Sequence, residues 1–434
     1  MTIWIGYTTL YREGGAKFSR VARTLARTLA EAHPEATVVA ESVESKADFV
    51  KAMQRIAASG KPLRQLHFVG HGGMYGPMFR TTKVPEQLSP HEWRTLALPF
   101  GEGATATFHA CRSARWFAPF FSRTFGVPTH GYHLYTTFSR RPDRFVLDLP
   151  SSSPDDPLYV VALPGKKSHG VGASVLKYAH VLPVEKMKRF EPERGPVDTS
   201  YDPVSELYDE AFADISVRAP EVAWIERHLP EGRPRVLEIG AGNGALLARL
   251  SPRIASGLGV DASRGMVDRA RARFGRLPNL RFESISGPVL PAEDASVDVV
   301  ISMLSWRYLD WDPMMAEVRR VLAPGGKLLV VDMVASPATL KDTPKLVASA
   351  IKSARDGFAR AAFKTKLAKL VADPRWAHML AYNPIRAEHE YRWYFEGRFP
   401  GRTVDLLTVA LASRVVAFDS GPLPRGFSLP QSYP

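Results

Sequence analysis

The chain has 434 residues, of which 45% are hydrophobic and 23% are charged, as in globular proteins and unlike disordered ones. Its formal net charge is +13, but the surplus of Lys and Arg is spread along the sequence. A solvated surface explains such a surplus better than a nucleic-acid-binding patch, so we expect no specific nucleic-acid partner. The length suits two or three domains.

The cysteine content and the lengths of the apolar runs indicate in which cellular compartment we expect the protein. The single cysteine, Cys111, excludes an internal disulfide and fits a reducing compartment. No apolar run approaches the length of a membrane span, and the N-terminus lacks the basic and apolar regions of a secretory signal. We therefore expect a cytoplasmic protein without a transmembrane segment.

Apolar strands and amphipathic helices alternate along the first 185 residues. The expected strands cover residues 2–8, 36–43, 63–69, 104–109 and 159–164. The expected helices cover residues 18–32, 47–58, 115–125 and 171–178. Such alternation predicts an α/β sandwich with a parallel sheet, whose chemistry lies at the carboxyl ends of the strands.

Two of these strand ends carry reactive side chains, His71 after the third strand and Cys111 after the fourth. Neighbouring parallel strands lie about 5 Å apart, so we expect His71 to face Cys111 as base to nucleophile. We also expect the N–H of Cys111 to begin a helix and, with that of Gly72, to form an oxyanion hole. The competing interpretation is a small buried residue beside a tight His-Gly-Gly turn.

The segment 109–113, His-Ala-Cys-Arg-Ser, resembles the Gln-Ala-Cys-Arg-Gly signature of caspases, and a His-Gly pair precedes it by about 40 residues as in that family. Residues 1–165 are thus similar to the caspase-like (clan CD) cysteine peptidases. The resemblance implies a caspase-like fold for residues 1–185, a catalytic dyad of His71 and Cys111, and a peptide or protein partner. The nearby His109, His130 and His133 have no zinc-ligand spacing, so we expect no metal site.

Residues 186–200 are charged and contain prolines, which is typical of a linker, and a second domain is expected at 201–434. Its most informative segment is 235–261. A short strand there leads into a loop with Gly240, Gly242 and Gly244, then a helix, then a strand that ends at Asp261. The free N–H groups of the helix and the bare loop suit a nucleotide-like ligand, and Asp261 is placed to accept ribose hydroxyls.

Two ligands compete for this loop. Gly240-x-Gly242-x-x-Ala245 satisfies the fingerprint for NAD, and Asp261 lies near the acidic offset of that fingerprint. However, Glu238 precedes the first glycine, and a carboxylate there repels a pyrophosphate. S-adenosylmethionine (SAM) has no phosphate and carries an amino group and a sulfonium, so Glu238 favours SAM.

The segment 235–261 resembles motifs I and II of the class I SAM-dependent methyltransferases. Further likeness lies in Leu290-Pro291, in 296–300, in the Pro-Gly-Gly turn at 324–326, and in the helices around 200–209 that cover the cofactor in that family. The resemblance spans residues 199–434 and implies a Rossmann-like fold. The cofactor contacts that it implies are Glu238, Gly240, Gly242, Asp261, Ala262, Met266, Ser286, Gly287 and Ser302.

Each implied contact has a role in that family. Glu238 would meet the methionine amino group, Asp261 the ribose, and Ser302, just past the fourth strand, the sulfonium. Ala262 and Met266 would border the adenine, although plain helix packing explains these two equally well. The sequence departs from the family pattern at Ser286 and Gly287, which stand where the family has Asp-Ala against the adenine.

The methyl acceptor is expected past the fourth strand, where Trp306 and Tyr308 would form an aromatic wall. An insertion at about 336–389 resembles a helical substrate lid, and its His378 and His389 are candidate bases. We therefore expect a methyltransferase acting on a small molecule of specialised metabolism, fused to a caspase-like domain. The alternatives are a cysteine peptidase with a regulatory methyltransferase domain, and a scaffold protein in which both domains have lost their chemistry.

Overall fold

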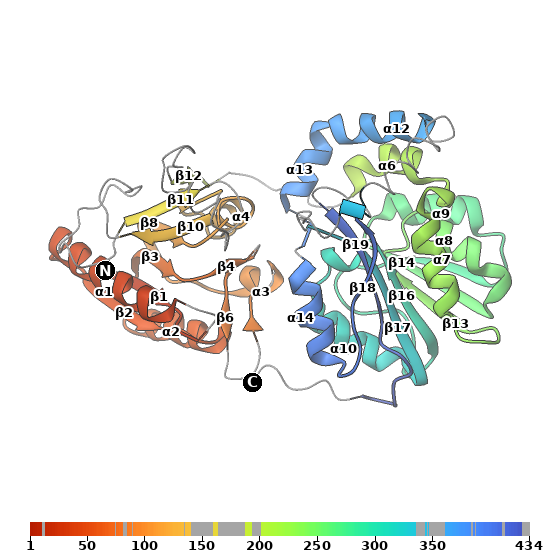
Figure 1. The fold of residues 1–434 in the computed structure, drawn as a ribbon, viewed down its shortest axis with the longest axis horizontal. Helices are drawn as coiled ribbons and strands as arrows, with labels where there is room; N and C mark the ends of the chain where they lie inside the picture. Colours follow the sequence, from red (N-terminus) through yellow and green to blue (C-terminus); the bar gives the residue numbers. More distant parts are fainter. Residues whose placement is uncertain are drawn as a thin grey trace. The chain divides into compact units, whose positions relative to one another are not determined.

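A computed structural model shows two compact units (Figure 1). Unit 1 comprises Met1–Pro196 with Ser432–Pro434, and unit 2 comprises Val197–Gln431. The structure describes residues 1–10, 14–73, 75–80, 85–88, 90–133, 135–139, 159–163, 187–192, 201–335, 343–344, 346, 361–382, 385–386, 388–409 and 413–427.

Unit 1 is built on a six-stranded sheet with the order β12-β9-β8-β3-β1-β2. Its strands are β1 (Thr2–Tyr7), β2 (Thr37–Ser42), β3 (Leu63–Val69), β8 (Phe100–His109), β9 (Thr129–Gly131) and β12 (Lys188–Phe190). Every neighbouring pair is parallel except β12 with β9. The parallel sheet predicted from the alternation is therefore present, with an antiparallel strand at one edge.

Helices cover both faces of this sheet. The helix α1 (Gly15–Ala32) packs on one face, and α2 (Lys46–Ala58) and α4 (Phe117–Phe125) pack on the other. The start of α2 is fixed by a capping box, because the Ser45 hydroxyl accepts from the Asp48 N–H and the Asp48 carboxylate accepts from the Ser45 N–H. The smaller elements of unit 1 are β4 (Gly72–Gly73), β5 (Gly76–Pro77), β6 (Phe79–Arg80), β7 (Pro85–Glu86), α3 (Pro90–Thr95), β10 (Tyr135–Ser139) and β11 (Tyr159–Leu163).

Unit 2 is built on a seven-stranded sheet with the order β15-β14-β13-β16-β17-β19-β18. The strands are β13 (Arg235–Ile239), β14 (Ser256–Asp261), β15 (Leu280–Ser284), β16 (Val297–Met303), β17 (Leu322–Ala335), β18 (Asp405–Val409) and β19 (Ser413–Asp419). The first five are parallel, and β19 runs antiparallel to both β17 and β18. The chain order reverses at β13, so a crevice for a ligand is expected where β13 and β16 end.

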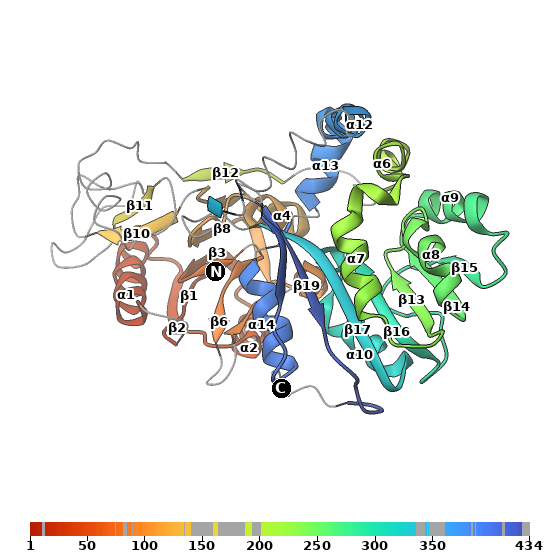
Figure 2. The same ribbon diagram turned by 45° about the vertical axis from the view of Figure 1, so that its right-hand side comes forward.

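Helices sandwich the second sheet as well. The helices α7 (Ala219–His228), α8 (Ala245–Leu250) and α9 (Arg264–Phe274) pack on one face, and α10 (Trp311–Val321) and α14 (Glu388–Arg398) pack on the other. Figures 1 and 2 both show α12 (Ala361–Ala372) beside α6 (Ser205–Phe212), and α13 (Pro374–Tyr382) follows α12. Short 3-10 helices complete the unit: η2 (Asp202–Val204), η3 (Ile215–Arg218), η4 (Ser251–Arg253) and η5 (Trp306–Tyr308).

Several expectations from the sequence need correction. Cys111 does not begin a helix, because it lies in a turn and α4 starts only at Phe117. Ser302 lies inside β16 rather than past it, since that strand continues to Met303. Residues 188–190, predicted as part of the linker, form the edge strand β12 of the first sheet, and β11 pairs with β10 in a separate two-stranded sheet. The helix predicted at 171–178, the rest of the linker from 193 to 200, and most of 336–360 within the predicted lid lie outside the described residues. No helix among the described residues is long and apolar enough to cross a membrane.

Candidate functional site

The glycine loop after β13 takes a backbone shape that other residues adopt at a cost. Gly240, Gly242 and Gly244 have φ values of 75°, 53° and 79°, all in the left-handed region. A Cβ at Gly240 would overlap the side chain of Ser305, whose hydroxyl donates to the Gly240 carbonyl at 3.1 Å. A Cβ at Gly242 would meet no atom within 4 Å. The loop is thus packed at its first glycine and open at its second.

Glu238 lies in β13 just before this loop and is 2% exposed. Its Oε2 atom has no hydrogen-bond partner. Burial, together with the negative charge of Asp261, raises the pKa of Glu238 well above its ordinary value, and the backbone of Leu247 opposes the shift. A buried carboxyl oxygen without a partner costs free energy, so the site suits a ligand that brings a hydrogen-bond donor, above all a cationic one.

Asp261 ends β14 next to the loop. One oxygen of its carboxylate accepts from the Gly242 N–H and the other from the Ser263 N–H, each at 2.8 Å. Burial raises the pKa of Asp261, and these two backbone donors oppose the rise. Each oxygen keeps a further lone pair, so the carboxylate can also accept from two hydroxyl groups.

Two acidic residues upstream fasten the first helices of unit 2 to this crevice. Asp202 of η2 accepts from the Ser263 hydroxyl and from the Gly265 N–H, the latter at 3.3 Å. Asp209 of α6 accepts from the Asn243 amide at 2.9 Å and binds the Arg273 guanidinium through two contacts of 2.6 Å. The sequence placed both segments over the cofactor but gave these side chains no role. Spacing alone does not reveal them, because their partners follow 34 to 64 residues later in the chain.

The four residues implied at the adenine end lie in two groups. Ala262, directly after Asp261, is exposed. Met266 belongs to α9, and its side chain is buried, with 2% exposed. Ser286 and Gly287 are exposed in the turn after β15, and Gly287 has a φ of 96°. The Ile285 N–H donates to the Asp261 carbonyl at 3.0 Å, which brings this turn beside the end of β14.

The segment after β16 differs from the predicted aromatic wall. Trp306 has no exposed surface and packs in the core against Phe395, so its ring lines no accessible surface. Trp306 and Tyr308 lie in the 3-10 helix η5. The side chain of Trp306 belongs to the hydrophobic core there, whereas Tyr308 is partly exposed. Ser302 is also fully buried, and its hydroxyl has no hydrogen-bond partner.

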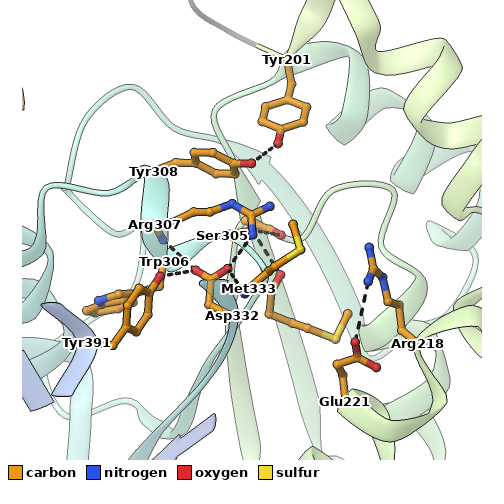
Figure 3. A network of polar contacts seen from close by, with 12 residues as sticks. Tyr201, Arg218, Glu221, Ser305, Trp306, Arg307, Tyr308, Asp332, Met333 and Tyr391 are labelled. Carbon is orange, nitrogen blue, oxygen red and sulfur yellow. Dashed lines mark hydrogen bonds and ion pairs between the residues drawn. The ribbon is translucent and has the colours of Figure 1, made fainter. Parts of the chain in front are cut away.

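A buried ion pair that the sequence did not predict joins η5 to the end of β17 (Figure 3). Asp332 is 0% exposed, and its Oδ1 accepts from Arg307 Nη1 and from the Met333 N–H, each at 2.8 Å. Its Oδ2 accepts from the Arg307 N–H at 2.8 Å and from the Tyr391 hydroxyl at 2.5 Å. Four donors therefore occupy the lone pairs of the two Asp332 carboxylate oxygens.

Arg307 also lies beside two tyrosines, Tyr308 and Tyr201. Its guanidinium lies 4.6 Å from the centre of the Tyr308 ring, and the Tyr308 and Tyr201 hydroxyls form a hydrogen bond. Burial raises the pKa of Tyr201 well above its ordinary value, with further contributions from the neighbouring phenol. Tyr208 and Trp376 stack beside Tyr201, so an aromatic cluster lies at this end of the crevice. His378 lies in α13 near Trp376, and nothing is described of the His389 side chain.

Comparison with known proteins agrees with this geometry. Residues 236–326 match the family model described as "Methyltransferase domain". This part of the chain is a class I methyltransferase domain. The model covers the glycine loop, Asp261 and the strands β13 to β16, which are the elements that form the crevice.

Two curated relatives each match less than a quarter of this chain. An uncharacterized methyltransferase of Mycobacterium tuberculosis is 38% identical over 103 residues, which cover 24% of this chain and 41% of that protein. The malonyl-[acyl-carrier protein] O-methyltransferase of Geobacter sulfurreducens is 38% identical over 95 residues, which cover 21% of this chain and 36% of that protein. The chain thus spans about two fifths of the length of the curated relatives it matches.

Solved structures show a weaker likeness. The [4+2]-cyclase SpnF has a TM-score of 0.34 at 20% identity, over 50% of this chain and 93% of that one. A SAM-dependent methyltransferase from Aquifex aeolicus has a TM-score of 0.31 at 19% identity, over 46% of this chain and 88% of that one. These scores are too low to support an argument beyond the family match.

The residues of the methyltransferase domain fit SAM, the cofactor of this class. The unpartnered oxygen of Glu238 suits the amino group of the methionine moiety, and Asp261 retains acceptor capacity for two ribose hydroxyls. The open space beside Gly242 lets the cofactor approach the backbone. Glu238, Asp261 and Gly242 include no positively charged side chain that could neutralise a pyrophosphate. This composition agrees with SAM rather than NAD.

Unit 1 brings its two expected reactive residues to matching strand ends. Val69 of β3 pairs with His109 of β8, so His71 and Cys111 each follow this pair by two residues. A Cβ at Gly72 would lie 2.9 Å from the Cys111 carbonyl, which shows how closely the two loops approach. The Cys111 sulfur accepts from the Thr136 N–H at 3.3 Å. The ring of His71 meets that of Phe18 edge to face, with 5.1 Å between the ring centres.

A buried histidine pair crosses the same sheet. His67 Nδ1 and His109 Nε2 are 3.1 Å apart, and His67 Nε2 lies 2.9 Å from Gln65 Oε1. Because that amide oxygen only accepts, His67 Nε2 carries the proton and His109 Nε2 donates to His67 Nδ1. Burial lowers the pKa of both imidazoles, that of His109 to about 3. No group of three or more potential ligands for a metal ion occurs among the described residues.

Proposed function

We propose that unit 2 transfers the methyl group of SAM to a small-molecule acceptor, as part of specialised metabolism. The observation that carries the proposal is the buried Glu238 oxygen without a partner, next to the positive-φ glycine loop and to Asp261. The match of residues 236–326 to the methyltransferase family model supports it.

The residues around the crevice divide the work between binding and alignment. Glu238 and Asp261 would hold the amino end and the ribose, and Ala262, Met266, Ser286 and Gly287 would border the adenine. Bound SAM supplies an electrophilic methyl group, and the site contributes orientation and exclusion of water. Ser302 lies near the end of β16, and Ser305 follows that strand and contacts the glycine loop at Gly240. Tyr308, three residues further on, would contact the methyl acceptor.

Calorimetric titration with SAM tests the binding half of the proposal. Asp261→Ala removes the ribose acceptor, and we expect SAM to bind about 10- to 100-fold more weakly, as for the loss of a charge-assisted hydrogen bond. Asp268→Ala in the following helix, α9, is the matched control, because that carboxylate is 75% exposed and pairs with Arg271 at 3.9 Å. Equal affinities in the two variants would remove Asp261 from the cofactor site.

We infer a second candidate activity for unit 1, a cysteine nucleophile at Cys111 with His71 as its base, in a caspase-like domain that takes a peptide or protein partner. The matching register of the two strand ends and the approach of Gly72 to Cys111 favour it. The sheet order β2-β1-β3-β8-β9 is compatible with a caspase-like domain and is shared by other doubly wound folds. An iodoacetamide probe should label Cys111, and its rate should fall at least tenfold in His71→Ala. Equal, slow labelling of both proteins would make Cys111 a structural residue.

A further inference from the structure

Arg307 lies in η5, directly after β16, where the proposed function places the methyl acceptor. Arg307 follows Ser305 by two residues, and the Ser305 hydroxyl touches the cofactor loop at Gly240. Asp332, its partner, follows the buried strand residues Val330 and Val331 of β17, which pair with Ser302 and Met303 of β16. The guanidinium therefore lies where the parallel strands β16 and β17 end, close to Asp332 (Figure 3).

The guanidinium has more donors than the protein supplies acceptors. Arg307 is 7% exposed, and among the nitrogens of its guanidinium Nη1 is the one that donates to Asp332. Its Nε has no partner, and no hydrogen bond of the described residues involves its Nη2. Asp332 cannot supply a second acceptor, because four donors already saturate it. An edge of the buried cation is thus unpaired, and leaving such donors unpaired is costly.

The unpaired edge of the guanidinium has the shape that a planar anion prefers. Two parallel N–H groups of a guanidinium bind a carboxylate in a bidentate way, with specific geometry. The Tyr308 ring covers one face of the guanidinium at 4.6 Å, which holds its plane. The hydrogen-bonded Tyr201 and Tyr308 hydroxyls lie beyond it and offer further polar contacts.

The same set of residues contains no proton acceptor for the reaction. Asp332 is saturated, and burial keeps the Tyr201 phenol protonated by raising its pKa. Among the described residues of this network, no carboxylate or imidazole is left to deprotonate an acceptor. A methyl acceptor that binds as an anion has no proton to lose, so it needs no such base.

We infer that the acceptor is a carboxylic acid, bound as its carboxylate by Arg307 and methylated on oxygen. This inference rests on the proposed methyltransferase function. A lone pair of the carboxylate oxygen forms the new O–CH3 bond while the S–CH3 bond breaks, and the electron pair stays on sulfur. The products are a methyl ester and S-adenosylhomocysteine, and no proton is transferred. Loss of the opposite charges of carboxylate and sulfonium is favoured where water is excluded.

The test uses the full chain, a cell extract depleted of macromolecules, and SAM with a labelled methyl group. Methyl esters release volatile labelled methanol on mild alkaline hydrolysis, whereas methylated phenols, amines and carbon atoms keep their label. We expect most of the incorporated label to become volatile. Incorporation of label that stays non-volatile overturns the carboxylate inference and leaves the proposed function intact. Absence of any incorporation overturns the proposed function and this inference with it.

Arg307→Lys sharpens the test, because lysine keeps the charge beside Asp332 but lacks the planar fork. We expect the rate of ester formation at limiting acceptor to fall about 10- to 100-fold, with SAM affinity changed less than about threefold. Arg398→Lys is the matched control, since Arg398 also pairs with an aspartate, Asp312 at 3.0 Å, and stacks on a tyrosine at 3.9 Å. Equal losses in both variants would mean that Arg307 is only structural and would overturn its assignment.

Discussion

Asp209 of α6 accepts a hydrogen bond of 2.9 Å from the side-chain amide of Asn243, which lies between two glycines of the cofactor loop. Asp209 is 4% exposed and also binds Arg273 of α9 through two contacts. One buried carboxylate therefore connects the covering helix, the glycine loop and the helix after β14. The loop is held in its binding shape by a residue more than 30 positions upstream.

Loss of this carboxylate should weaken cofactor binding without removing any cofactor contact. In Asp209→Ala, the amide of Asn243 and the guanidinium of Arg273 lose their shared partner, so the loop gains freedom that SAM must remove again. We expect the Kd for SAM to rise about tenfold, and the free energy of unfolding of unit 2 to fall by about 1–3 kcal/mol. Glu210→Ala on the same helix is the control, since Glu210 is exposed and pairs with Lys369 at 3.1 Å. Comparable effects in both variants would contradict this account.

Glu238 should make SAM binding depend on pH. Its pKa in the free protein is raised, so the carboxyl is protonated over a pH range in which an exposed glutamate is ionised. The amino group of SAM is bound best by the ionised form, so binding releases a proton and affinity should fall as pH is lowered. We expect Glu238→Gln to bind SAM about 10- to 100-fold more weakly at pH 8 and to show a flatter pH dependence. Parallel pH profiles for the two proteins, measured by calorimetry, would exclude Glu238 from the amino-group site.

The same raised pKa has a consequence for stability. An acid with a raised pKa in the folded state favours folding at low pH and loses that contribution as pH rises through the folded-state pKa. Glu238→Gln keeps the neutral form at every pH. The variant should therefore unfold at a higher temperature than the wild type at pH 8, and the difference should shrink at pH 5. A lower melting temperature for the variant at pH 8 would contradict the burial of an uncompensated charge.

Two glycines of the loop should respond differently to alanine. A methyl group at Gly240 overlaps Ser305 and also requires a left-handed backbone, so Gly240→Ala should lower both stability and SAM affinity. A methyl group at Gly242 meets open space in the free protein, so Gly242→Ala should cost only the backbone strain of about 1–2 kcal/mol. It should nevertheless abolish SAM binding, because the space it fills is that of the cofactor. Thermal unfolding combined with calorimetry separates the two effects, and retained SAM binding in Gly242→Ala would place the cofactor elsewhere.

The histidine pair of unit 1 should make its sheet sensitive to acid. The folded-state pKa of His109 is lowered to about 3, so its contribution to stability is complete above the unfolded-state value near 6.5 and is lost as pH falls toward 3. Each such group changes stability by about 1.4 kcal/mol per pH unit in this range. We expect amide hydrogen exchange of β3 and β8 to accelerate between pH 6.5 and pH 5 beyond the intrinsic rate. His109→Gln should reduce this acceleration, and an unchanged acceleration in the variant would exclude the histidine pair as its cause.

The sequence was informative where a residue's role is local. Gly240, Gly242, Glu238 and Asp261 lie within one strand-loop-helix-strand unit, so their spacing alone predicts a nucleotide-like site, and the structure places them together. The strands β1, β2, β3 and β8 of the first sheet were predictable for the same reason, because each is a short apolar run between turns. The short edge strands β9 and β12 were not expected.

Residues that act through distant partners were not predictable in this way. The pairing of Arg307 with Asp332 spans 25 residues, and that of Tyr391 with Asp332 spans 59. Only an Asp at the end of the apolar run of β17 and an Arg between two aromatic residues hinted at them. Trp306 was misplaced for a related reason. An aromatic residue after a strand fits a binding wall and a core equally well, and the helical turn of η5 decides between them by turning the ring inward.

The most direct test of the central claim is a calorimetric titration of the full chain with SAM and, separately, with NAD. We expect SAM to bind with one site per chain and NAD to bind at least 100-fold more weakly, because Glu238 repels a pyrophosphate and offers an acceptor to an amino group. Tight binding of NAD, or no heat from SAM at concentrations up to the millimolar range, would contradict the assignment of this crevice to methyl transfer.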